Sequence, residues 1–242
     1  MTGGLVGQVA LITGGGSGVG GAIALAMARA GADICIVGRR LERLEEIAGE
    51  AHRLGVRASC IATDLSRDDA AIALAQRVLA ELGGVDIVVH SAARFERGSI
   101  EAAPLDVLDA VYRTNLRAPY ALTQALLPTL KQRQGQVVMV NSSSGISAKP
   151  TTAQYDASKH ALKALADSLR AEVNGEGVRV LSVYLGRTAS EMQASVHAME
   201  GKPYRPELLL QPADVAAVVV NALTLPRTAE VTDIHIRPML KS

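Results

Sequence analysis

One stretch near the N-terminus decides the fold: Val9-Ala-Leu-Ile-Thr13 runs directly into Gly14-Gly-Gly-Ser-Gly-Val-Gly-Gly21. An apolar, β-branched run followed by a glycine cluster and an Ala- and Leu-rich segment predicts a strand, a tight turn and a helix. Glycine has no Cβ, so the main chain can turn sharply and a phosphate group can approach it closely. The N–H groups at the start of the helix then favour an anion, and we expect a phosphate-binding loop here.

Two glycine spacings overlap in this loop. Gly16, Gly18 and Gly21 fit G-x-G-x-x-G, whereas Gly14, Gly18 and Gly20 fit a second spacing with three residues between the first two glycines. So many glycines make either match easy to obtain, and a merely structural turn is the alternative. The strand before the loop and the helix after it favour a dinucleotide site. The residues expected to contact the cofactor in this loop are Gly14, Gly16, Ser17, Gly18, Val19 and Gly20.

Further apolar runs alternate with segments of helical periodicity, such as the stripe formed by Leu162, Leu165, Ala166 and Leu169. Strands that alternate with helices predict βαβ units with right-handed crossovers. We therefore expect one doubly wound α/β Rossmann domain over residues 1–242, with a parallel sheet of about seven strands and helices on both faces. The predicted strands are Val9–Thr13, Ile34–Gly38, Ala58–Ala62, Ile87–His90, Val137–Asn141, Val178–Tyr184 and Val231–Ile236.

The segment from Arg187 to Pro212 departs from this alternation. It follows a strand, contains three prolines and has weak periodicity. Loops that leave the carboxyl ends of parallel strands build ligand sites, so residues 187–212 are predicted to form a substrate lid. Met192, Met199 and Tyr204 are candidates to line an apolar substrate site, with ordinary packing of the lid as the alternative.

The overall composition excludes several classes of function. The 242 residues include 25 Lys and Arg against 24 Asp and Glu, and this balance argues against a nucleic-acid binder. No apolar run approaches about 18 residues, so no membrane partner is expected. The start of the chain lacks a secretion signal, and Cys35 and Cys60 lie in apolar runs typical of buried, reduced thiols, which predicts a cytoplasmic protein. The histidines show no metal-ligand spacing, so no metal is expected.

The end of the second predicted strand bears on which dinucleotide is bound. An acidic residue there would hold the ribose 2′-OH of NAD, whereas arginine accommodates the 2′-phosphate of NADP. The strand ends at Gly38 without a carboxylate, and Arg39 and Arg40 follow at once. These two guanidinium groups favour NADP. The alternative is that one of them pairs with Glu42.

A tyrosine and a lysine four residues apart, Tyr155 and Lys159, open the helix that carries the leucine stripe. Residues at this spacing share one helix face. A nearby ammonium group lowers the pKa of a phenol, which predicts a general acid or base for exchange between a carbonyl and an alcohol. A solvated surface pair is the alternative. The preceding strand runs into three serines at 142–144, any of which could donate a hydrogen bond to a substrate oxygen.

With these motifs in order, the chain resembles the short, single-domain branch of the short-chain dehydrogenase/reductase family over essentially its whole length. Thr13–Gly20 is similar to the family's T-G-x-x-x-G-x-G loop, and Tyr155 with Lys159 to its catalytic pair. The family's catalytic serine lies 13 residues before the tyrosine, which selects Ser142. Asn115 matches an asparagine that kinks its helix and relays protons through water to the lysine.

The resemblance also implies the role of each residue. Ser142 would polarise the carbonyl, Tyr155 would exchange the proton, and Lys159 would lower the pKa of the tyrosine and hold the nicotinamide ribose. Asp64 and Leu65 would contact the adenine, His90 and Ala92 would lie near the adenosine ribose, and Gly186 and Thr188 would face the nicotinamide. For His90 the residue chemistry also allows a strand-end histidine with a local hydrogen bond and no direct role. Related proteins form homodimers or homotetramers.

The resemblance therefore implies an NADP(H)-dependent oxidoreductase that acts on a small carbonyl or secondary alcohol substrate. The Arg237-Pro238 ending lacks the Gly-rich close of the acyl-carrier-protein reductases and is more similar to the hydroxy-acid (serine-type) dehydrogenases and sepiapterin-reductase-like members. Two alternatives stay open. One is a non-catalytic protein that binds NADP(H) and senses its redox ratio, for which the departures from the family pattern at Ala93 and Leu185 leave room. The other is NAD-linked oxidation of an alcohol.

Overall fold

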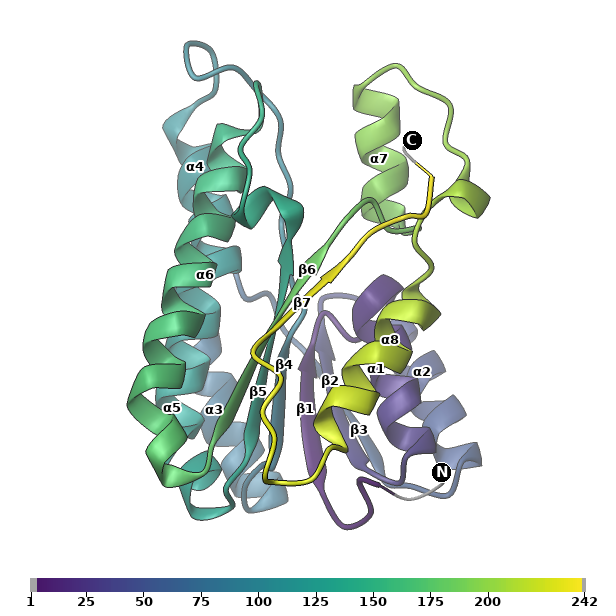
Figure 1. The fold of residues 1–242 in the computed structure, drawn as a ribbon, viewed down its shortest axis with the longest axis vertical. Coiled ribbons are helices and arrows are strands. Elements are labelled where there is room, and N and C mark those ends of the chain that lie inside the picture. The colour runs from purple at the N-terminus through teal and green to yellow at the C-terminus, as the bar shows by residue number, and fades with distance from the viewer. Residues whose placement is uncertain (1–3, 241–242) are drawn as a thin grey trace.

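A computed structural model describes residues 4–240 of the chain, and Figure 1 shows a sheet between two layers of helices. All strand pairs are parallel, in the order β3-β2-β1-β4-β5-β6-β7. The strands are β1 (Val9–Thr13), β2 (Asp33–Gly38), β3 (Ala58–Ala62), β4 (Ile87–His90), β5 (Gln136–Ser142), β6 (Arg179–Leu185) and β7 (Asp233–Ile236). The prediction of a seven-stranded, doubly wound sheet is confirmed, although β7 begins two residues later than expected.

The helices connect successive strands and cover both faces of the sheet. They are α1 (Gly18–Arg29), α2 (Leu41–Arg53), α3 (Ala70–Leu82), α4 (Leu105–Tyr112), α5 (Ala118–Gln132), α6 (Ala153–Val173), α7 (Glu191–Met199) and α8 (Pro212–Leu223). A π-helical turn, Arg113–Arg117, joins α4 to α5. Short 3-10 turns occupy Ser143–Gly145, Asn174–Glu176 and Pro206–Leu208.

Alternation along the strands divides the buried side chains into two cores. In β1, Ile12 faces the core formed with α1, α2 and α8, whereas Leu11 faces the core formed with α3, α5 and α6. Both side chains are fully buried. Each face of the sheet is thus closed by its own helices, as a parallel sheet that is apolar on both sides requires. The predicted stripe on α6 supplies Leu162, Ala166 and Leu169 to the second core.

The direction of strand succession reverses between β1 and β4, which are neighbours in the sheet. Ligands bind at such a switch point, outside the carboxyl ends of the strands. The hydroxyl of Thr13 holds the two strand ends together. It accepts hydrogen bonds from the N–H groups of Ser91 (3.1 Å) and Ala92 (3.2 Å) and donates one to the carbonyl of Val89 (3.3 Å).

The predicted lid contains more regular structure than expected. Its central part is the helix α7, which stands above the carboxyl ends of the strands in Figure 1. The Ser190 hydroxyl caps α7 by accepting from the N–H of Gln193 at 3.1 Å. Only Val196 and His197 of this helix are buried, so the sequence carries no apolar stripe that would reveal it.

The two ends of the lid lie against each other. Leu210 donates its N–H to the carbonyl of Arg187 at 3.1 Å, and Ala189 donates to the carbonyl of Leu210 at 2.9 Å. The Tyr204 hydroxyl accepts from the N–H of Ser190 at 3.1 Å, whereas Met192 and Met199 are exposed. Tyr204 is therefore part of the internal packing of the lid.

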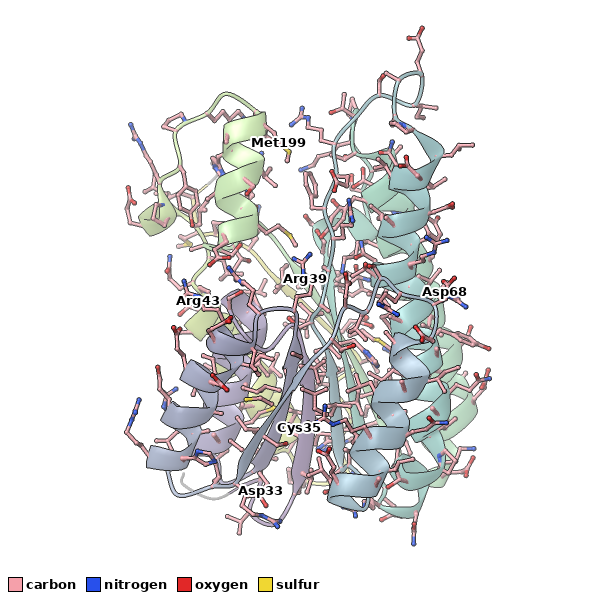
Figure 2. All side chains as sticks on the ribbon, turned by 180° about the vertical axis from the view of Figure 1, so that it is seen from behind. Asp33, Cys35, Arg39, Arg43, Asp68 and Met199 are labelled. Atoms are coloured by element: carbon pink, nitrogen blue, oxygen red, sulfur yellow. The ribbon has the colours of Figure 1, made fainter. Side chains whose placement is uncertain are left out.

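The two cysteines lie on neighbouring strands but belong to different cores. Cys35 is fully buried in the core with α3, α5 and α6, and Cys60 packs against the other one. Figure 2 shows Cys35 in the middle of the sheet, away from the edge that carries Arg39. Both thiols are free. Within residues 4–240, no helix has the length and apolar character needed to cross a membrane.

Candidate active site

The glycine loop after β1 is packed so tightly that side chains would not fit. Gly14 has a positive φ of 68°, and a Cβ there would lie 2.8 Å from the main-chain nitrogen of Ala92. A Cβ on Gly20 would collide with the carbonyl oxygen of Gly14. These two glycines let the loop fold back against the end of β4 and bring its N–H groups to the switch point.

The start of α1 leaves its N–H groups without a side-chain partner. Ser17, the residue before the helix, makes no side-chain capping bond, and the first turn contains no acidic residue. The free N–H groups and the helix dipole together favour an anion at this position. Gly16 adds a close approach to α2, because a Cβ there would lie 3.3 Å from the Cβ of Arg43.

The arginines after β2 differ in their partners. Arg40 pairs with Glu191 at the start of α7, with 2.8 Å between Nη2 and Oε2, and not with Glu42 as the alternative had it. Arg43 pairs with Glu46 at 3.0 Å. Arg39 has no carboxylate within ion-pair distance in the described part of the chain, and Figure 2 shows it at the carboxyl end of the sheet. Of these three arginines, Arg39 is therefore the one whose charge is most available.

Asp64 lies beyond the end of β3 in a hydrogen-bonded turn. Its Oδ1 accepts from the N–H of Ser66 at 3.0 Å and from the Ser66 hydroxyl at 2.8 Å. The bond from the Ser66 main chain is the largest influence on the pKa of Asp64, and Arg39 also lowers this pKa. The carboxylate is thus ionised and fixed in orientation. The neighbouring Leu65 is buried.

The His90 side chain lies in the interior and makes the local hydrogen bond that the residue chemistry allowed as the alternative. The ring is 3% exposed, and its Nε2 lies 2.8 Å from the Thr123 hydroxyl on α5. Burial lowers the pKa of His90 to about 3, so the ring is neutral. Only the main chain at the end of β4 remains at the switch point, where the N–H of Ala92 is held by Thr13.

The catalytic candidates from β5 and α6 meet at the same edge of the sheet. Ser142 is the last residue of β5, and its hydroxyl accepts from the N–H of Ser144 at 3.1 Å. Tyr155 and Lys159 lie one turn apart on α6, with Lys159 Nζ 5.7 Å from the centre of the tyrosine ring. The lysine donates to the carbonyl of Val140 at 3.1 Å.

The balance of effects on Tyr155 differs from the sequence-based expectation. Burial raises the pKa of Tyr155 to about 12, while the Ser142 side chain acts in the opposite direction. Burial also lowers the pKa of Lys159 to about 8. Lys159 does not offset the effect of burial on the pKa of Tyr155, because its ammonium group is directed to the Val140 carbonyl. Tyr155 is therefore a neutral phenol near pH 7.

Asn141 and Gly145 allow the turn after β5 to pack closely against the main chain of α6 at Lys159. Asn141 donates from Nδ2 to the carbonyl of Lys159 at 3.1 Å. A Cβ on Gly145 would lie 2.7 Å from the side-chain oxygen of Asn141 and 2.9 Å from the Lys159 carbonyl. The turn after β5 can pack on α6 only because residue 145 is glycine.

Asn115 occupies the middle of the π-helical turn and is 1% exposed. Its Oδ1 accepts from the N–H of Arg94 at 2.7 Å, and its Nδ2 donates to the carbonyl of Arg94 at 2.9 Å and to the Ser158 hydroxyl at 3.0 Å. The Ser158 hydroxyl donates in turn to the carbonyl of Tyr155 at 2.7 Å. Asn115 thus ties the segment after β4 to the helix that carries the tyrosine.

Gly186 and Thr188 lie directly after β6, beside Ser142, because Leu185 pairs with Ser142 in the sheet. The Thr188 hydroxyl donates to the carbonyl of Gly186 at 3.0 Å, which shapes the turn into the lid. A Cβ on Gly18 would lie 3.5 Å from the Cβ of Ser190, so the base of the lid approaches the glycine loop.

A group of side chains around Glu200, at the end of the lid, was not predicted from the sequence. Arg97, from the segment after β4, and Arg187, from the base of the lid, both form ion pairs with this carboxylate. His197, which is 4% exposed, lies 3.3 Å from Arg187. These residues are distant in sequence and form no spacing pattern, so nothing in the sequence links them. No group of three His, Cys, Asp or Glu side chains within residues 4–240 is arranged to hold a metal ion.

The fold and the site define a class: a doubly wound α/β protein with a tightly packed glycine loop before its first helix and a serine, tyrosine and lysine at the same sheet edge. The short chain dehydrogenase family profile matches residues 8–201. A short chain dehydrogenase from Pseudocercospora fijiensis is 36% identical, with 89% of this chain and 76% of the relative covered. The chain belongs to the short-chain dehydrogenase/reductase family and is an oxidoreductase of that family.

Solved structures with the same fold include proteins bound to NADP or a derivative. An alcohol dehydrogenase from the archaeon Thermococcus sibiricus, complexed with 5-hydroxy-NADP, has a TM-score of 0.88 at 28% identity and covers 97% of this chain and 98% of its own. A short chain dehydrogenase from Burkholderia cenocepacia in complex with NADP has a TM-score of 0.85 at 31% identity and covers 96% of this chain and 97% of its own.

Proposed function

We propose that the protein is an NADP(H)-dependent oxidoreductase that transfers hydride between the nicotinamide and a small carbonyl or secondary alcohol substrate. The observation that carries this proposal is the meeting of Ser142, Tyr155 and Lys159 at the sheet edge that also holds the glycine loop. A hydroxyl, a phenol and an ammonium group at one place are the groups that proton exchange with a substrate oxygen requires.

The residues present fit the cofactor. The cradle formed by Gly14 and Gly20 and the uncapped start of α1 suit a pyrophosphate. Within residues 4–240, Arg39 has no ion-pair partner at the position expected for a 2′-phosphate, and no acidic residue occupies the end of β2. NADPH, when bound, supplies the hydride, and the protein supplies orientation and electrostatics.

The side chains of the site divide the remaining work. With its pKa raised to about 12, Tyr155 carries its proton at neutral pH and is ready to donate it to a carbonyl oxygen that receives a hydride. Ser142 holds the same oxygen by a hydrogen bond. Burial lowers the pKa of Lys159 to about 8, and its ammonium group bonds the Val140 carbonyl. To stabilise the phenolate left behind, the ammonium group must turn from this carbonyl toward the ring, whose centre is 5.7 Å away. For oxidation of an alcohol, Tyr155 must first lose its proton, so oxidation rises with pH.

The test is to follow NADPH consumption over a panel of ketones, diketones, keto acids and keto esters, with the wild-type protein and Tyr155→Phe. We expect the Phe variant to bind NADPH normally but to lose at least ~10²-fold in kcat, the usual size of general acid–base catalysis. The ring contact with Phe95, at 5.0 Å between centroids, needs no hydroxyl and is retained in the variant. Turnover that persists in Tyr155→Phe would refute the mechanism.

A further inference from the structure

The lid and the segment after β4 are joined at one carboxylate, that of Glu200. Arg97 Nη1 lies 3.2 Å from Glu200 Oε1, although the two residues come from different elements. Two residues before Arg97, the Phe95 ring packs edge-on against the ring of Tyr155. Arg97 is therefore on the segment that borders the catalytic phenol.

Arg187 reaches the same carboxylate from the other direction. It follows Leu185, the sheet neighbour of Ser142, by two residues. Its Nη2 donates to both oxygens of Glu200, at 2.8 and 2.9 Å, and Lys202 Nζ lies 3.2 Å away. Burial alone would raise the pKa of Glu200, but the bonds from Arg187 and Lys202 outweigh it and lower this pKa to about 2. The carboxylate is ionised at any physiological pH.

The charges in this cluster do not balance. Among the residues that the structure describes, Arg97, Arg187 and Lys202 share the single carboxylate of Glu200, which leaves two positive charges without an anion there. His197 adds no negative charge. Because Arg187 can only donate, His197 Nε2 accepts from it, and the ring proton lies on Nδ1, which donates to the carbonyl of Gln193 at 2.8 Å.

Neither of the two nearest other carboxylates in these segments is free to neutralise the excess charge, and Glu101 and Glu207 form no ion pair with Arg97, Arg187 or Lys202. Glu96 is paired with Arg94 at 2.9 Å, and Glu191 with Arg40 at 2.8 Å. Arg97 and Arg187 are only 33% and 25% exposed, so water screens their charge incompletely. Cations partly withdrawn from water are costly unless an anion balances them.

We propose that the substrate carries a carboxylate in addition to its carbonyl or alcohol group, and that Arg97, held in place by Glu200, binds this carboxylate. The inference rests on the proposed function and specifies its substrate class as keto acids and hydroxy acids. Arg97 uses Nη1 for Glu200, and its guanidinium fork retains further donors suited to a second carboxylate. Arg97 is thus a specificity residue and takes no part in proton transfer.

The experiment compares a keto acid with its own methyl ester, since the two differ in charge but little in shape. We measure NADPH-dependent kcat/KM for both in the wild-type protein, Arg97→Gln and Arg94→Gln. The acid should exceed the ester at least ~10-fold in the wild type, because a charge-assisted hydrogen bond contributes about 1.5–3 kcal/mol. Arg97→Gln should abolish this preference by raising KM for the acid much more than for the ester, and turnover of the ester shows that the variant is folded.

Arg94→Gln is the matched control because it removes a cation from the same segment, one that is already paired with Glu96. It should keep the preference for the acid. Equal kcat/KM for acid and ester in the wild type, or an equal loss of both in Arg97→Gln, would overturn the inference. Turnover of neutral ketones alone, still dependent on Tyr155, would also overturn it but would preserve the proposed function. Absence of Tyr155-dependent turnover of any carbonyl would overturn both.

Discussion

At the scale of single residues, the buried polar side chains of this protein act by fixing main-chain segments. Thr13 joins the ends of β1 and β4, and Asn115 joins the segment after β4 to α6. Nearly all of their hydrogen bonds are to main-chain N–H and C=O groups. These buried groups are thereby paired and held in fixed positions. The position of Tyr155 therefore depends on Asn115, through the Ser158 hydroxyl that bonds the Tyr155 carbonyl.

His90 makes a residue-scale prediction about acid stability. The pKa of His90 falls from 6.5 to about 3 on folding. Between about pH 3 and pH 6.5 the imidazole is therefore protonated in the unfolded chain but neutral in the native state. Stability is therefore lost as pH falls below 6.5, with a limiting slope of ~1.4 kcal/mol per pH unit. His90→Asn keeps a polar group for Thr123 but has no group that titrates in this range. When the pH is lowered from 7 to 5, we expect the wild type to lose about 2 kcal/mol more unfolding free energy than this variant.

Urea denaturation at the two pH values measures this difference. His52→Asn is the control, since His52 is exposed on α2. Its unfolding free energy should follow the wild type at both pH values. Parallel curves for His90→Asn and the wild type would contradict the burial of a neutral ring.

Residue chemistry alone predicted which functional groups lie in the site but not their pKa values. The tyrosine and lysine were evident from their spacing, whereas the choice of Ser142 among three serines needed the family resemblance. The raised pKa of Tyr155 was not predictable, because it depends on burial and on the reach of Lys159 to the Val140 carbonyl. Both are properties of packing between elements far apart in the sequence.

At the scale of elements, α7 is held to the rest of the molecule at both of its ends. Glu191, its first residue, pairs with Arg40 beyond β2, and Glu200, just after its last residue, pairs with Arg97 and Arg187. The strands were predictable because continuous apolar runs mark them. The helix in the lid was not, because it buries little and its ties are ion pairs without periodicity.

The pair between Arg40 and Glu191 predicts an effect on cofactor preference. If both arginines after β2 bind a 2′-phosphate, Glu191 competes with that phosphate for Arg40. Glu191→Gln should then tighten NADPH binding by up to about 5-fold, the most that an exposed pair of this kind provides. NADH binding, measured by the same fluorescence titration, should stay constant.

The matched control for this experiment is Glu81→Gln, which breaks the exposed pair with Arg77 on α3. It should change the affinity for neither cofactor. An equal change in NADPH and NADH affinity in Glu191→Gln would show that the effect comes from the lid and not from the phosphate.

At the scale of the whole molecule, the two cores share one sheet, and contacts at its amino end hold the last elements in place. Arg179, at the start of β6, is 9% exposed and donates to carbonyls at the end of α8 and in the segment that follows it. Its Nη2 bonds Leu223 at 2.9 Å, and its Nη1 bonds Ala229 at 2.9 Å and Leu225 at 3.2 Å. One guanidinium group thus connects the end of α8 to the sheet.

Replacing this group should destabilise the entire domain. Arg179→Met leaves several carbonyls without donors, and we expect a loss of about 3 kcal/mol and a fall in Tm of roughly 6–12 °C. Arg179→Lys should recover little of this stability, since one ammonium group cannot reach all the carbonyls that the two Nη atoms of the guanidinium group bond. Arg227→Met, which removes an exposed arginine with a single long bond to Gly177 (3.4 Å), is the control and should change Tm by less than about 2 °C. Thermal unfolding followed by circular dichroism measures all three, and an unchanged Tm in Arg179→Met would contradict this role.

The closure of the lid upon itself has a consequence for how such a protein can diversify. Because Leu210 bonds back to Arg187, the chain between them leaves the scaffold and returns to it at one point. The entropy of closing a loop changes only slowly with its length, so a longer or shorter segment can replace this one at little cost to the sheet. The lid is in effect an exchangeable cassette. On the proposed function, new substrate preferences would be acquired by substituting this segment, while Ser142, Tyr155 and Lys159 would be inherited unchanged.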